Sequence, residues 1–213
     1  LFSFSQNEIK RDLGDFYKIQ TYDLLNVNLI KSDANKVVIS GKHSNSVVVK
    51  NKNGELKLRM GVEKRLSGSE TKIDLYYKNL YRLEAKEGSF IFSKDTVSGP
   101  TLFIKAESGA TISLKVKTPD ISSKSLSGGK IILSGNATHS DINAYTGGQV
   151  NATNMRSETT KVFIKAGGVV DVYTTSLLEL DLKAGGEANV HYKTSKIIEK
   201  ITLGGIVNYL YKD

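Results

Sequence analysis

Residues that could perform chemistry are few in this chain, and their spacing does not bring them together. The three histidines, His43, His139 and His191, form no His-x-x-His or His-x-His pair, and no cysteine is present. Zinc sites need closely spaced imidazole or thiolate ligands. The sequence also lacks a Gly-x-Ser-x-Gly nucleophile motif and a phosphate-binding loop. We therefore expect no metal site and no cofactor.

Acidic side chains offer one route to catalysis on a β scaffold. Glycoside hydrolases use two carboxylates that converge on one groove. The nearest acidic grouping here is Asp171, Glu179 and Asp181. The alternation of the strands puts Asp171 on a different face from Glu179 and Asp181. We therefore predict no catalytic residue and a non-enzymatic protein, and keep a carbohydrate-active enzyme as the alternative.

Four tyrosines are the best candidates for a binding surface. Tyrosine combines an apolar ring with a hydroxyl group, which suits contacts with glycans and with proteins. Strand tyrosines also often pack half-buried against their neighbours, and that interpretation stays open. On the first interpretation the partners are glycans or surface and matrix proteins. The candidate residues are Tyr22, Tyr76, Tyr77 and Tyr81.

A repeat carries most of these residues. Between residues 83 and 207 the chain shows one phrase seven times: an apolar alternation, a small residue, one or two glycines, and a second apolar alternation. The last glycines of successive phrases are 18 to 21 residues apart. So steady a period is typical of stacked units that share one core. The predicted corners are Gly88, Gly109, Gly129, Gly148, Gly168, Gly186 and Gly205.

Alternation on both sides of each corner predicts which side chains face inward. Counting two and four residues back and forward from the second glycine gives apolar positions. These are Ile164, Ala166, Leu182, Ala184, Ile201 and Leu203 before the corner, and Val150, Ala152, Val170, Val172, Ala188, Val190, Val207 and Tyr209 after it.

The third residue after the second glycine forms an outward column that we interpret as a hydrogen-bonded ladder along the stack. The column consists of Asn151, Asp171, Asn189 and Asn208. Calcium needs six to eight oxygen ligands and a carboxylate-rich site. Because this column holds one carboxylate, we do not predict a calcium site.

Charge and hydropathy exclude several classes of partner. The net charge is +8, with +5 in residues 1–80 (14 basic, 9 acidic) and +3 in the rest. A basic excess can attract nucleic acid, anionic glycans or lipid headgroups. RNA-binding signatures are absent, so we predict no nucleic-acid partner and interpret the lysines as a solvated surface. No apolar run approaches about 20 residues, and we predict no transmembrane segment.

The fold class follows from the repeat and the absence of helical periodicity. We predict an all-β solenoid of about ten coils, with about 19–20 residues per coil in its C-terminal part. Residues 1–213 are expected to form a single domain. Within it, residues 1–79 form less regular coils and a cap, and residues 80–213 form regular glycine-cornered coils. We interpret residues 62–70 as a mobile loop.

Several motifs match a known family. They are Asp15-Phe-Tyr-Lys-Ile19, Asn26-Val-Asn-Leu29, Lys36-Val-Val-Ile-Ser-Gly41, Asn53-Gly-Glu-Leu-Lys-Leu58 and the closing Ile201-Thr-Leu-Gly-Gly-Ile-Val-Asn-Tyr209. With them the chain resembles the putative auto-transporter adhesin, head GIN domain family, a domain of unknown function common in Bacteroidetes. The resemblance covers nearly the whole chain. It implies a right-handed, single-stranded β-helix that is exported to the cell envelope.

Localisation and role are expected to follow the family. The chain begins at Leu1 rather than methionine, so we expect that an export signal has been removed and that the protein lies at the cell surface or in the periplasm. Asp95-Thr96-Val97 matches a short pattern that Bacteroidetes glycosylate on threonine. We expect an adhesin or ligand-binding protein that acts through its lateral surface. A self-assembling envelope scaffold, a homo-oligomer joined through unpaired terminal coils, is a further alternative.

Overall fold

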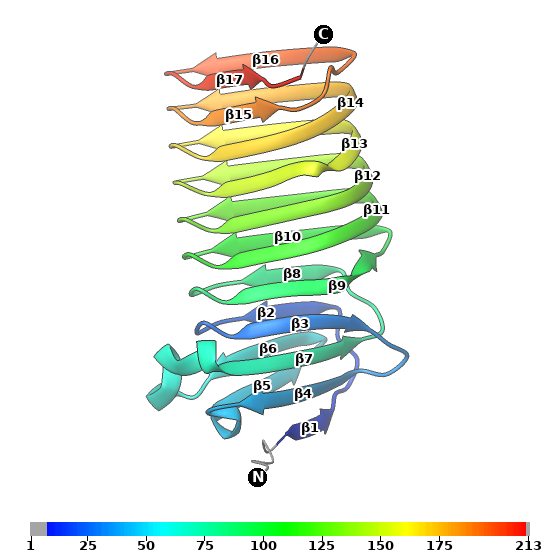
Figure 1. The fold of residues 1–213 in the computed structure, drawn as a ribbon, viewed down its shortest axis with the longest axis vertical. Coiled ribbons are helices and arrows are strands. Elements are labelled where there is room, and N and C mark those ends of the chain that lie inside the picture. Colours follow the sequence, from blue (N-terminus) through cyan, green and yellow to red (C-terminus); the bar gives the residue numbers. More distant parts are fainter. Residues whose placement is uncertain (1–7, 212–213) are drawn as a thin grey trace, which may run out of the picture.

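A computed structural model describes residues 8–211. It is 68% β-strand and forms a β-solenoid of about 7 turns (Figure 1). The predicted all-β solenoid is confirmed. The expected ten coils are too many, because the N-terminal strands do not continue as simple coils.

All 17 strands belong to one hydrogen-bonded sheet. The described chain contains two 3₁₀ helices, η1 (Ser44–Ser46) and η2 (Val62–Glu70). The second occupies the segment interpreted as a mobile loop. The strands are β1 (Ile9–Asp12), β2 (Lys18–Thr21), β3 (Asn26–Lys31), β4 (Lys36–Gly41), β5 (Val47–Lys52), β6 (Glu55–Met60), β7 (Thr71–Tyr77), β8 (Arg82–Ala85), β9 (Phe90–Ser98), β10 (Thr101–Glu107), β11 (Thr111–Leu126), β12 (Lys130–Tyr145), β13 (Gln149–Lys165), β14 (Val169–Lys183), β15 (Glu187–Val190), β16 (Lys196–Thr202) and β17 (Ile206–Tyr209).

From β8 onward the strands stack in parallel, and each coil has a narrow edge and a wide edge. The glycine turns form the narrow edge, on the left in Figure 1, and the long strands β11 to β14 bend through the wide edge on the right. The first half of β11 pairs with β9, whereas its second half pairs with β10. One long strand therefore contributes to both broad faces of the solenoid.

Two consecutive left-handed residues make each narrow turn. In the turn before β13, for example, Thr146 has φ 47° and Gly147 has φ 72°. Such a pair is the backbone of a tight two-residue turn, and glycine is favoured at its second position. The next residue packs on the rung below. A Cβ at Gly148 would lie 2.3 Å from the Ser125 carbonyl oxygen, so this third position accepts only small residues.

In the first two rungs, the glycine predicted as the corner lies one turn position earlier than in the other five rungs. Gly129, Gly148, Gly168, Gly186 and Gly205 occupy the third position of their turns, as their place after the left-handed pair shows. Gly88 and Gly109 instead occupy the second position, with φ 68° and 71°. Ser89 and Ala110 fill the third place in those rungs, and both are fully buried.

Inward positions after the corner were predicted correctly. Val150, Val170 and Ala188 are at most 1% exposed and lie in register on successive rungs. Before the corner, Ile164 and Leu182 are buried as predicted. These stripes stack into one continuous apolar core.

Three predicted inward residues are wrong. Ala166, Ala184 and Leu203 are the first, left-handed residues of their turns and are exposed, Leu203 by 85%. A residue at that place turns its Cβ away from the stack. Ile201 and Tyr209 occupy inward register positions but are 46% and 44% exposed, because no described rung covers the last coil.

The N-terminal strands follow a different path from the coils. The rung of β2 and β3 lies between β6 and β7 on one side and β8 and β9 on the other, all in parallel. The chain leaves this rung through β4 to β7 and then crosses back to β8. Strand β4 pairs antiparallel with β7 and β1, and β5 pairs antiparallel with β6. That the whole chain forms one domain stays a prediction.

Candidate functional site: a groove along the wide edge

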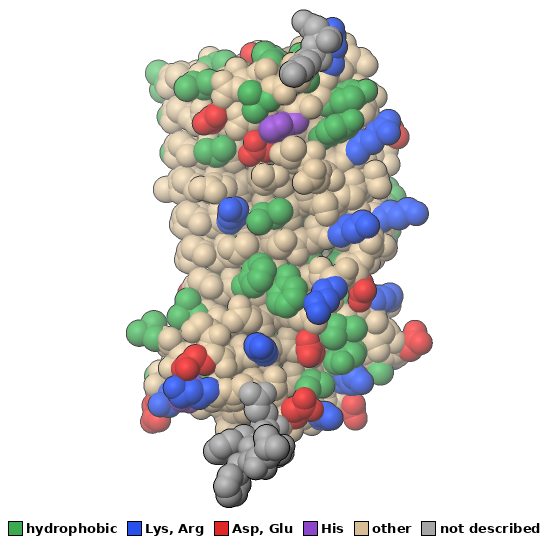
Figure 2. Space-filling view, in the orientation of Figure 1, with side chains coloured by type: hydrophobic (Ala, Val, Ile, Leu, Met, Phe, Trp, Pro, Cys, Tyr) green, Lys and Arg blue, Asp and Glu red, His purple; other side chains and the backbone are tan. Residues whose placement is uncertain are grey.

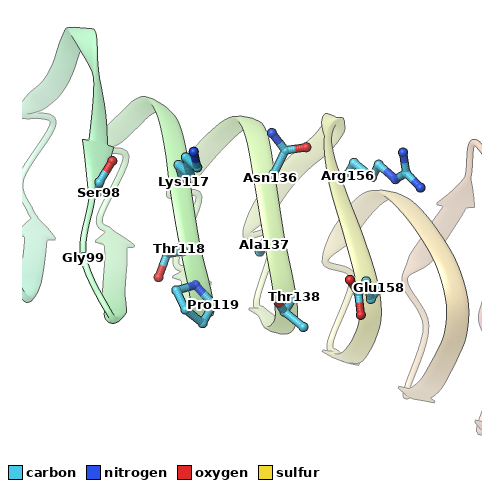
Figure 3. A pocket seen from close by; sticks show the side chains of 10 residues that line it. All are labelled: Ser98, Gly99, Lys117, Thr118, Pro119, Asn136, Ala137, Thr138, Arg156 and Glu158. Carbon is cyan, nitrogen blue, oxygen red and sulfur yellow. The ribbon is translucent and has the colours of Figure 1, made fainter.

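A hollow lies at the wide edge of the solenoid, over β11 and β12. Its volume is about 720 Å³. Figure 3 shows its side chains in two rows that run along the stack. The lining residues are Ser98, Gly99, Lys117, Thr118, Pro119, Asn136, Ala137, Thr138, Arg156 and Glu158.

Irregular strands border this groove on both sides. Strand β9 shifts register against β11 between Phe92 and Thr96, and β13 shifts register against both β12 and β14. Strands β11 and β12 between them stay in regular register on both sides of the bend. Bulges are common next to binding sites because they redirect side chains. Here they lie on either side of the two regular strands.

Inside the bend, buried hydroxyl groups hold the backbone in place. Ser157 and Thr174 each contact the Thr160 hydroxyl at 2.6 Å, and Thr194 donates to the Thr174 carbonyl at 2.7 Å. These residues are at most 9% exposed. They satisfy polar groups that an apolar core would leave without partners. These hydrogen bonds link β13, β14 and Thr194 inside the bend.

One row of the groove is a column of polar and basic residues in strict register. Lys117 on β11 lies beside Asn136 on β12, which lies beside Arg156 on β13. All three side chains are exposed, and in the part of the chain that the structure describes neither cation has an ion-pair partner. Ser98 precedes the column on β9. We call Lys117, Asn136 and Arg156 the cation column.

Aromatic rings continue the cation column toward the C-terminus. Tyr173 is the register partner of Arg156. Its ring stacks on that of Tyr192, with the centroids 4.6 Å apart and the planes at 29°. Stacked tyrosines present flat apolar faces with hydroxyl groups at their rims.

The opposite row contains Pro119, Thr138 and Glu158 (Figure 3). Beneath it, Gly135 has φ 102°, and a Cβ there would lie 2.1 Å from the Val116 carbonyl oxygen. Glycine at this position therefore lets β12 lie close against β11 below the groove. Glu158 is the one carboxylate among the lining residues, so the groove lacks the pair that glycoside hydrolysis requires.

Comparison with known families identifies the chain. The sequence profile of the family described as "Putative auto-transporter adhesin, head GIN domain" matches residues 15–195. The chain belongs to this family.

Solved structures show the same fold. This head GIN domain is similar to a "putative adhesin" from Bacteroides fragilis NCTC 9343, with a TM-score of 0.86 and 16% identity over 97% of this chain and 98% of that one. A "putative adhesin" from Parabacteroides merdae ATCC 43184 gives a TM-score of 0.70 and 17% identity over 99% and 97%. A "putative lipid binding protein" from Parabacteroides distasonis ATCC 8503 gives 0.65 and 17% over 98% of both chains. No curated protein sequence matches.

The four candidate tyrosines of this head GIN domain do not form one platform. Tyr77 is 1% exposed, so predicting it as a binding residue was wrong. Burial and the charge of Asp95 raise the pKa of Tyr77 to about 12. Tyr22 and Tyr81 lie at opposite ends of β2, since the Tyr81 amide bonds to the carbonyl oxygen of Tyr17, whereas Tyr22 follows the strand. Tyr76 lies on β7 beneath the Lys36 ammonium, 4.2 Å from its ring centroid.

The predicted outward ladder is in register, but its side chains bond in different ways. Asn151, Asp171, Asn189 and Asn208 are successive register partners. Asn208 donates to the Asn189 side chain at 2.9 Å. Asp171 instead contacts His191 Nε2 at 2.9 Å, and Asn151 accepts from the Thr153 amide.

The remaining candidates lie apart. Asp171 is on the half of β14 that pairs with Asn151, whereas Glu179 and Asp181 lie past the bend and are 3.6 Å from Lys161 and Lys183 respectively. His139 contacts the Thr159 hydroxyl at 2.7 Å. His43 precedes η1. Thr96 of the glycosylation pattern is exposed on β9 beside the groove.

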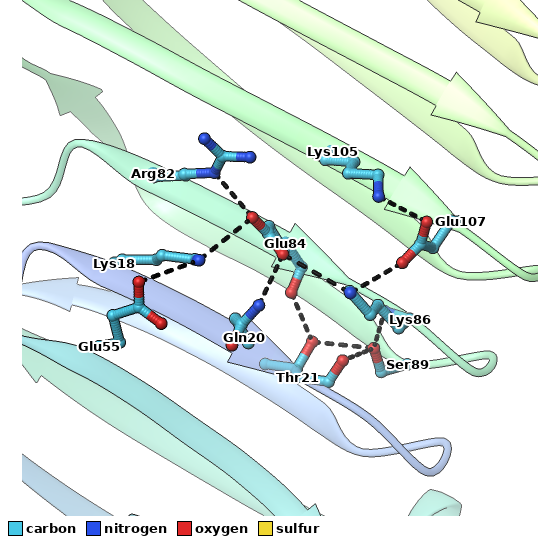
Figure 4. A network of polar contacts seen from close by, with 10 residues as sticks. All are labelled: Lys18, Gln20, Thr21, Glu55, Arg82, Glu84, Lys86, Ser89, Lys105 and Glu107. Atoms are coloured by element: carbon cyan, nitrogen blue, oxygen red, sulfur yellow. Dashed lines mark hydrogen bonds and ion pairs between the residues drawn. The ribbon is translucent and has the colours of Figure 1, made fainter. Parts of the chain in front are cut away.

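A network of ion pairs crosses the broad face that β2, β8 and β10 form (Figure 4). Glu84, 4% exposed, lies 2.7 Å from both Gln20 Nε2 and Arg82 Nε and 3.6 Å from Lys18 Nζ. Burial alone raises the pKa of Glu84, but the hydrogen bonds from Gln20 and Arg82 and the charge of Lys18 outweigh it, so the pKa is lowered. Here the cations are neutralised, unlike those of the groove.

The cation column was not predicted, because the alignment of the repeats extends only four residues past each corner glycine. Lys117, Asn136 and Arg156 lie eight or nine residues after Gly109, Gly128 and Gly147. The bulge in β13 adds the extra residue before Arg156. Extending the same alignment along each repeat would have aligned the three residues to within one position.

Proposed function

We propose that this head GIN domain is a non-enzymatic, exported cell-envelope protein that binds a ligand through the wide-edge groove, as an adhesin does. The observation that carries the proposal is a groove with a single carboxylate and two cations, Lys117 and Arg156, that have no ion-pair partner among the described residues. Unneutralised charge in a hollow attracts a ligand of opposite sign. The names of the family and of similar structures, adhesins and a lipid-binding protein, support binding over catalysis.

The lateral surface suits extended ligands such as glycans or surface and matrix proteins. Affinity on such an open groove is the sum of many modest contacts. None of the described helices is long and apolar enough to cross a membrane. We further propose that the protein lies at the cell surface or in the periplasm. Cleavage by an added protease on intact cells would place it at the surface, and protection until the outer membrane is opened would place it in the periplasm.

A binding screen tests the proposed function. The purified chain is presented to arrays of glycans and extracellular-matrix proteins, and each ligand found is tested again with the Lys117→Ala/Arg156→Ala variant. The matched control is Lys130→Ala/Lys165→Ala, which removes the same charge from exposed positions outside the groove. We expect binding to weaken only in the groove variant. Equal binding by the two variants would show that the groove is not the site.

A carbohydrate-active enzyme is the second candidate, and one observation favours it. Past the wide bend, a smaller hollow of about 310 Å³ brings together Asp120, His139, Asp141 and Lys161. Asp120 and His139 are register partners on adjacent rungs. Incubation with plant and host glycans, followed by assays for new reducing ends and unsaturated products, tests this candidate. Turnover that Asp141→Asn abolishes would establish it.

A further inference from the structure

We propose that the ligand of the groove is a linear polysaccharide that lies parallel to the solenoid axis and carries an anionic group on every second sugar. This inference rests on the proposed function and specifies its substrate class. Its basis is the order and spacing of charge along the cation column.

The cation column places like groups two rungs apart. Lys117 and Arg156 lie on β11 and β13, and the uncharged Asn136 lies on the rung between them. Stacked strands are about 4.8 Å apart, so the two backbone positions are separated by about 10 Å along the axis. An extended sugar chain advances by about one rung spacing per sugar, so two sugars span the distance between the two cations. Alternate sugars of a chain laid along the column therefore meet a cation, and the sugar between them meets an amide.

The chemistry of each side chain fits such an alternating polymer. The guanidinium of Arg156 can bind a carboxylate or sulfate with two parallel hydrogen bonds, and the ammonium of Lys117 binds the same groups as a point charge. The amide of Asn136 offers donors and an acceptor, which suit sugar hydroxyl or acetamido groups. The stacked rings of Tyr173 and Tyr192 extend the column with a surface on which a sugar face can pack.

Cations on one broad face of the molecule are neutralised, unlike the two cations of the groove. On the broad face that β2, β8 and β10 form, four cations lie within 4 Å of glutamates on the same or neighbouring rungs (Figure 4). They are Lys18, Arg82, Lys86 and Lys105. Over the middle of the face seen in Figure 2 the surface is mostly uncharged, and Lys and Arg side chains project at the wide edge.

Glu158 lets the groove discriminate between polymers charged on every sugar and polymers charged on alternate sugars. It lies two residues past Arg156 on β13, in the row opposite the cation column (Figure 3). A polymer with a charge on every sugar would bring some of its anions toward this carboxylate, and like charges repel. A polymer charged on alternate sugars can direct its anions to Lys117 and Arg156 and turn its neutral sugars to Glu158. Specificity of this kind combines attraction with repulsion.

The test compares three size-matched polymers by isothermal titration calorimetry: hyaluronan, which alternates a uronate with a neutral sugar, polygalacturonate, charged on every sugar, and neutral dextran. We expect hyaluronan to bind most tightly, with an affinity that falls as salt rises. Lys117→Ala should weaken it by about tenfold, the loss of one charge-assisted hydrogen bond, and Arg156→Ala, which removes a two-bonded contact, by at least as much. The Lys130→Ala/Lys165→Ala control should match the wild type, and Glu158→Gln should improve polygalacturonate alone.

Other outcomes overturn the inference. Equal or tighter binding of polygalacturonate or dextran would exclude alternation of charge as the recognised feature. If no polysaccharide binds, but a protein ligand from the screen depends on Lys117 and Arg156, the inference fails and the proposed function stands. If no ligand depends on these residues, both fail. Because both side chains are exposed and lack ion-pair partners in the described chain, the variants should keep the melting temperature of the wild type.

Discussion

At its N-terminal end the solenoid is covered by strands that run against the stack, whereas at its C-terminal end the last coil of the described chain lies open. Strands β1, β4 and β5 pair antiparallel with their neighbours, and Val37 and Ile39 of β4 are fully buried. In the last coil, by contrast, Ile201 and Tyr209 are 46% and 44% exposed although they point along the inward columns.

The open end carries a charged residue at a position where the rung below carries a leucine. Glu199 of β16 is the register partner of the buried Leu180. Its carboxylate accepts a hydrogen bond from the Tyr209 hydroxyl, which lies in the adjoining inward column. Burial, then the hydrogen bond and charge of Glu199, raise the pKa of Tyr209 to about 12. An inward charge on an edge strand discourages further pairing. The comparison teaches that the edge of a stack can be protected by covering it or by a charged layer that is costly to cover.

The largest expected difference between the two ends comes from the same truncation in each. Ile39→Ala should lower the free energy of unfolding by about 2–5 kcal/mol, because it opens a cavity beneath the cap. Ile201→Ala should cost less than about 1 kcal/mol, since that side chain is already half exposed. Urea unfolding followed by circular dichroism measures both. Similar costs would mean that the C-terminal coil is covered in solution.

Corners inside the stack should be nearly as sensitive. Gly186 has φ 110°, and a Cβ there would lie 2.4 Å from Ile164 Cγ2. Gly186→Val should therefore cost at least about 1–3 kcal/mol through backbone strain alone. Glu187→Val, one residue later on the outward side, should change stability little, although it removes an acceptor of Asn208. Melting temperatures of the two variants provide the comparison, and equal effects would contradict the assigned turn geometry.

Acid should weaken the capped end through the ion-pair network. The lowered pKa of Glu84 means that its contribution is complete above the usual value of 4.5 and is lost as the pH falls through the folded-state pKa. Glu107, whose burial is outweighed by hydrogen bonds from Lys105 and Lys86, behaves in the same direction. Glu84→Gln should cost about 1–3 kcal/mol at neutral pH and flatten the loss of stability below pH 4.5.

Stability curves from pH 7 to pH 3 check this prediction, with the exposed Glu158→Gln as the control. An unchanged acid profile in Glu84→Gln would show that other carboxylates dominate.

The smallest effect concerns association at the open end. Glu199→Leu restores the residue type of the rung below and should allow two chains to pack end to end at high concentration. Sedimentation velocity at increasing concentration measures this, with Glu158→Leu as a matched loss of charge at the wide edge. The antiparallel strands at the other end limit growth to dimers. Wild-type chains that associate as strongly as the variant would argue for the self-assembling scaffold.

Sequence predicted the regular part of the solenoid in detail, but of residues 1–79 only that they form less regular coils and a cap. Alternation identified Val150, Val170 and Ala188 as inward because each lies at a fixed distance from a glycine turn. The same alternation cannot tell parallel from antiparallel partners, so the reversed path of β4 through β7 was not predicted. Strand patterns specify faces, whereas register partners depend on connections that are formed in three dimensions.

The candidate site lay beyond what the alignment could show for a related reason. Tyrosines drew attention because of their type, and Tyr77 turned out to be buried in the core. Lys117 and Arg156 are unremarkable by type, and their significance comes from stacking and from the absence of partners among the described residues. Bulges such as that in β13 shift the count by a residue, and no local signal in the sequence announces them.

The left-handed pair at each narrow turn has a consequence for how this fold tolerates change. In the seven turns from β8 onward the first residue of each pair is exposed, and these residues range from charged to apolar: Glu87, Ser108, Ser127, Thr146, Ala166, Ala184 and Leu203. The core places no demand on these side chains beyond a backbone that short polar residues adopt most easily. The narrow edge is therefore a row of freely variable sites at one-rung intervals. Such a row suits the display of an engineered array of peptides on the edge away from the groove.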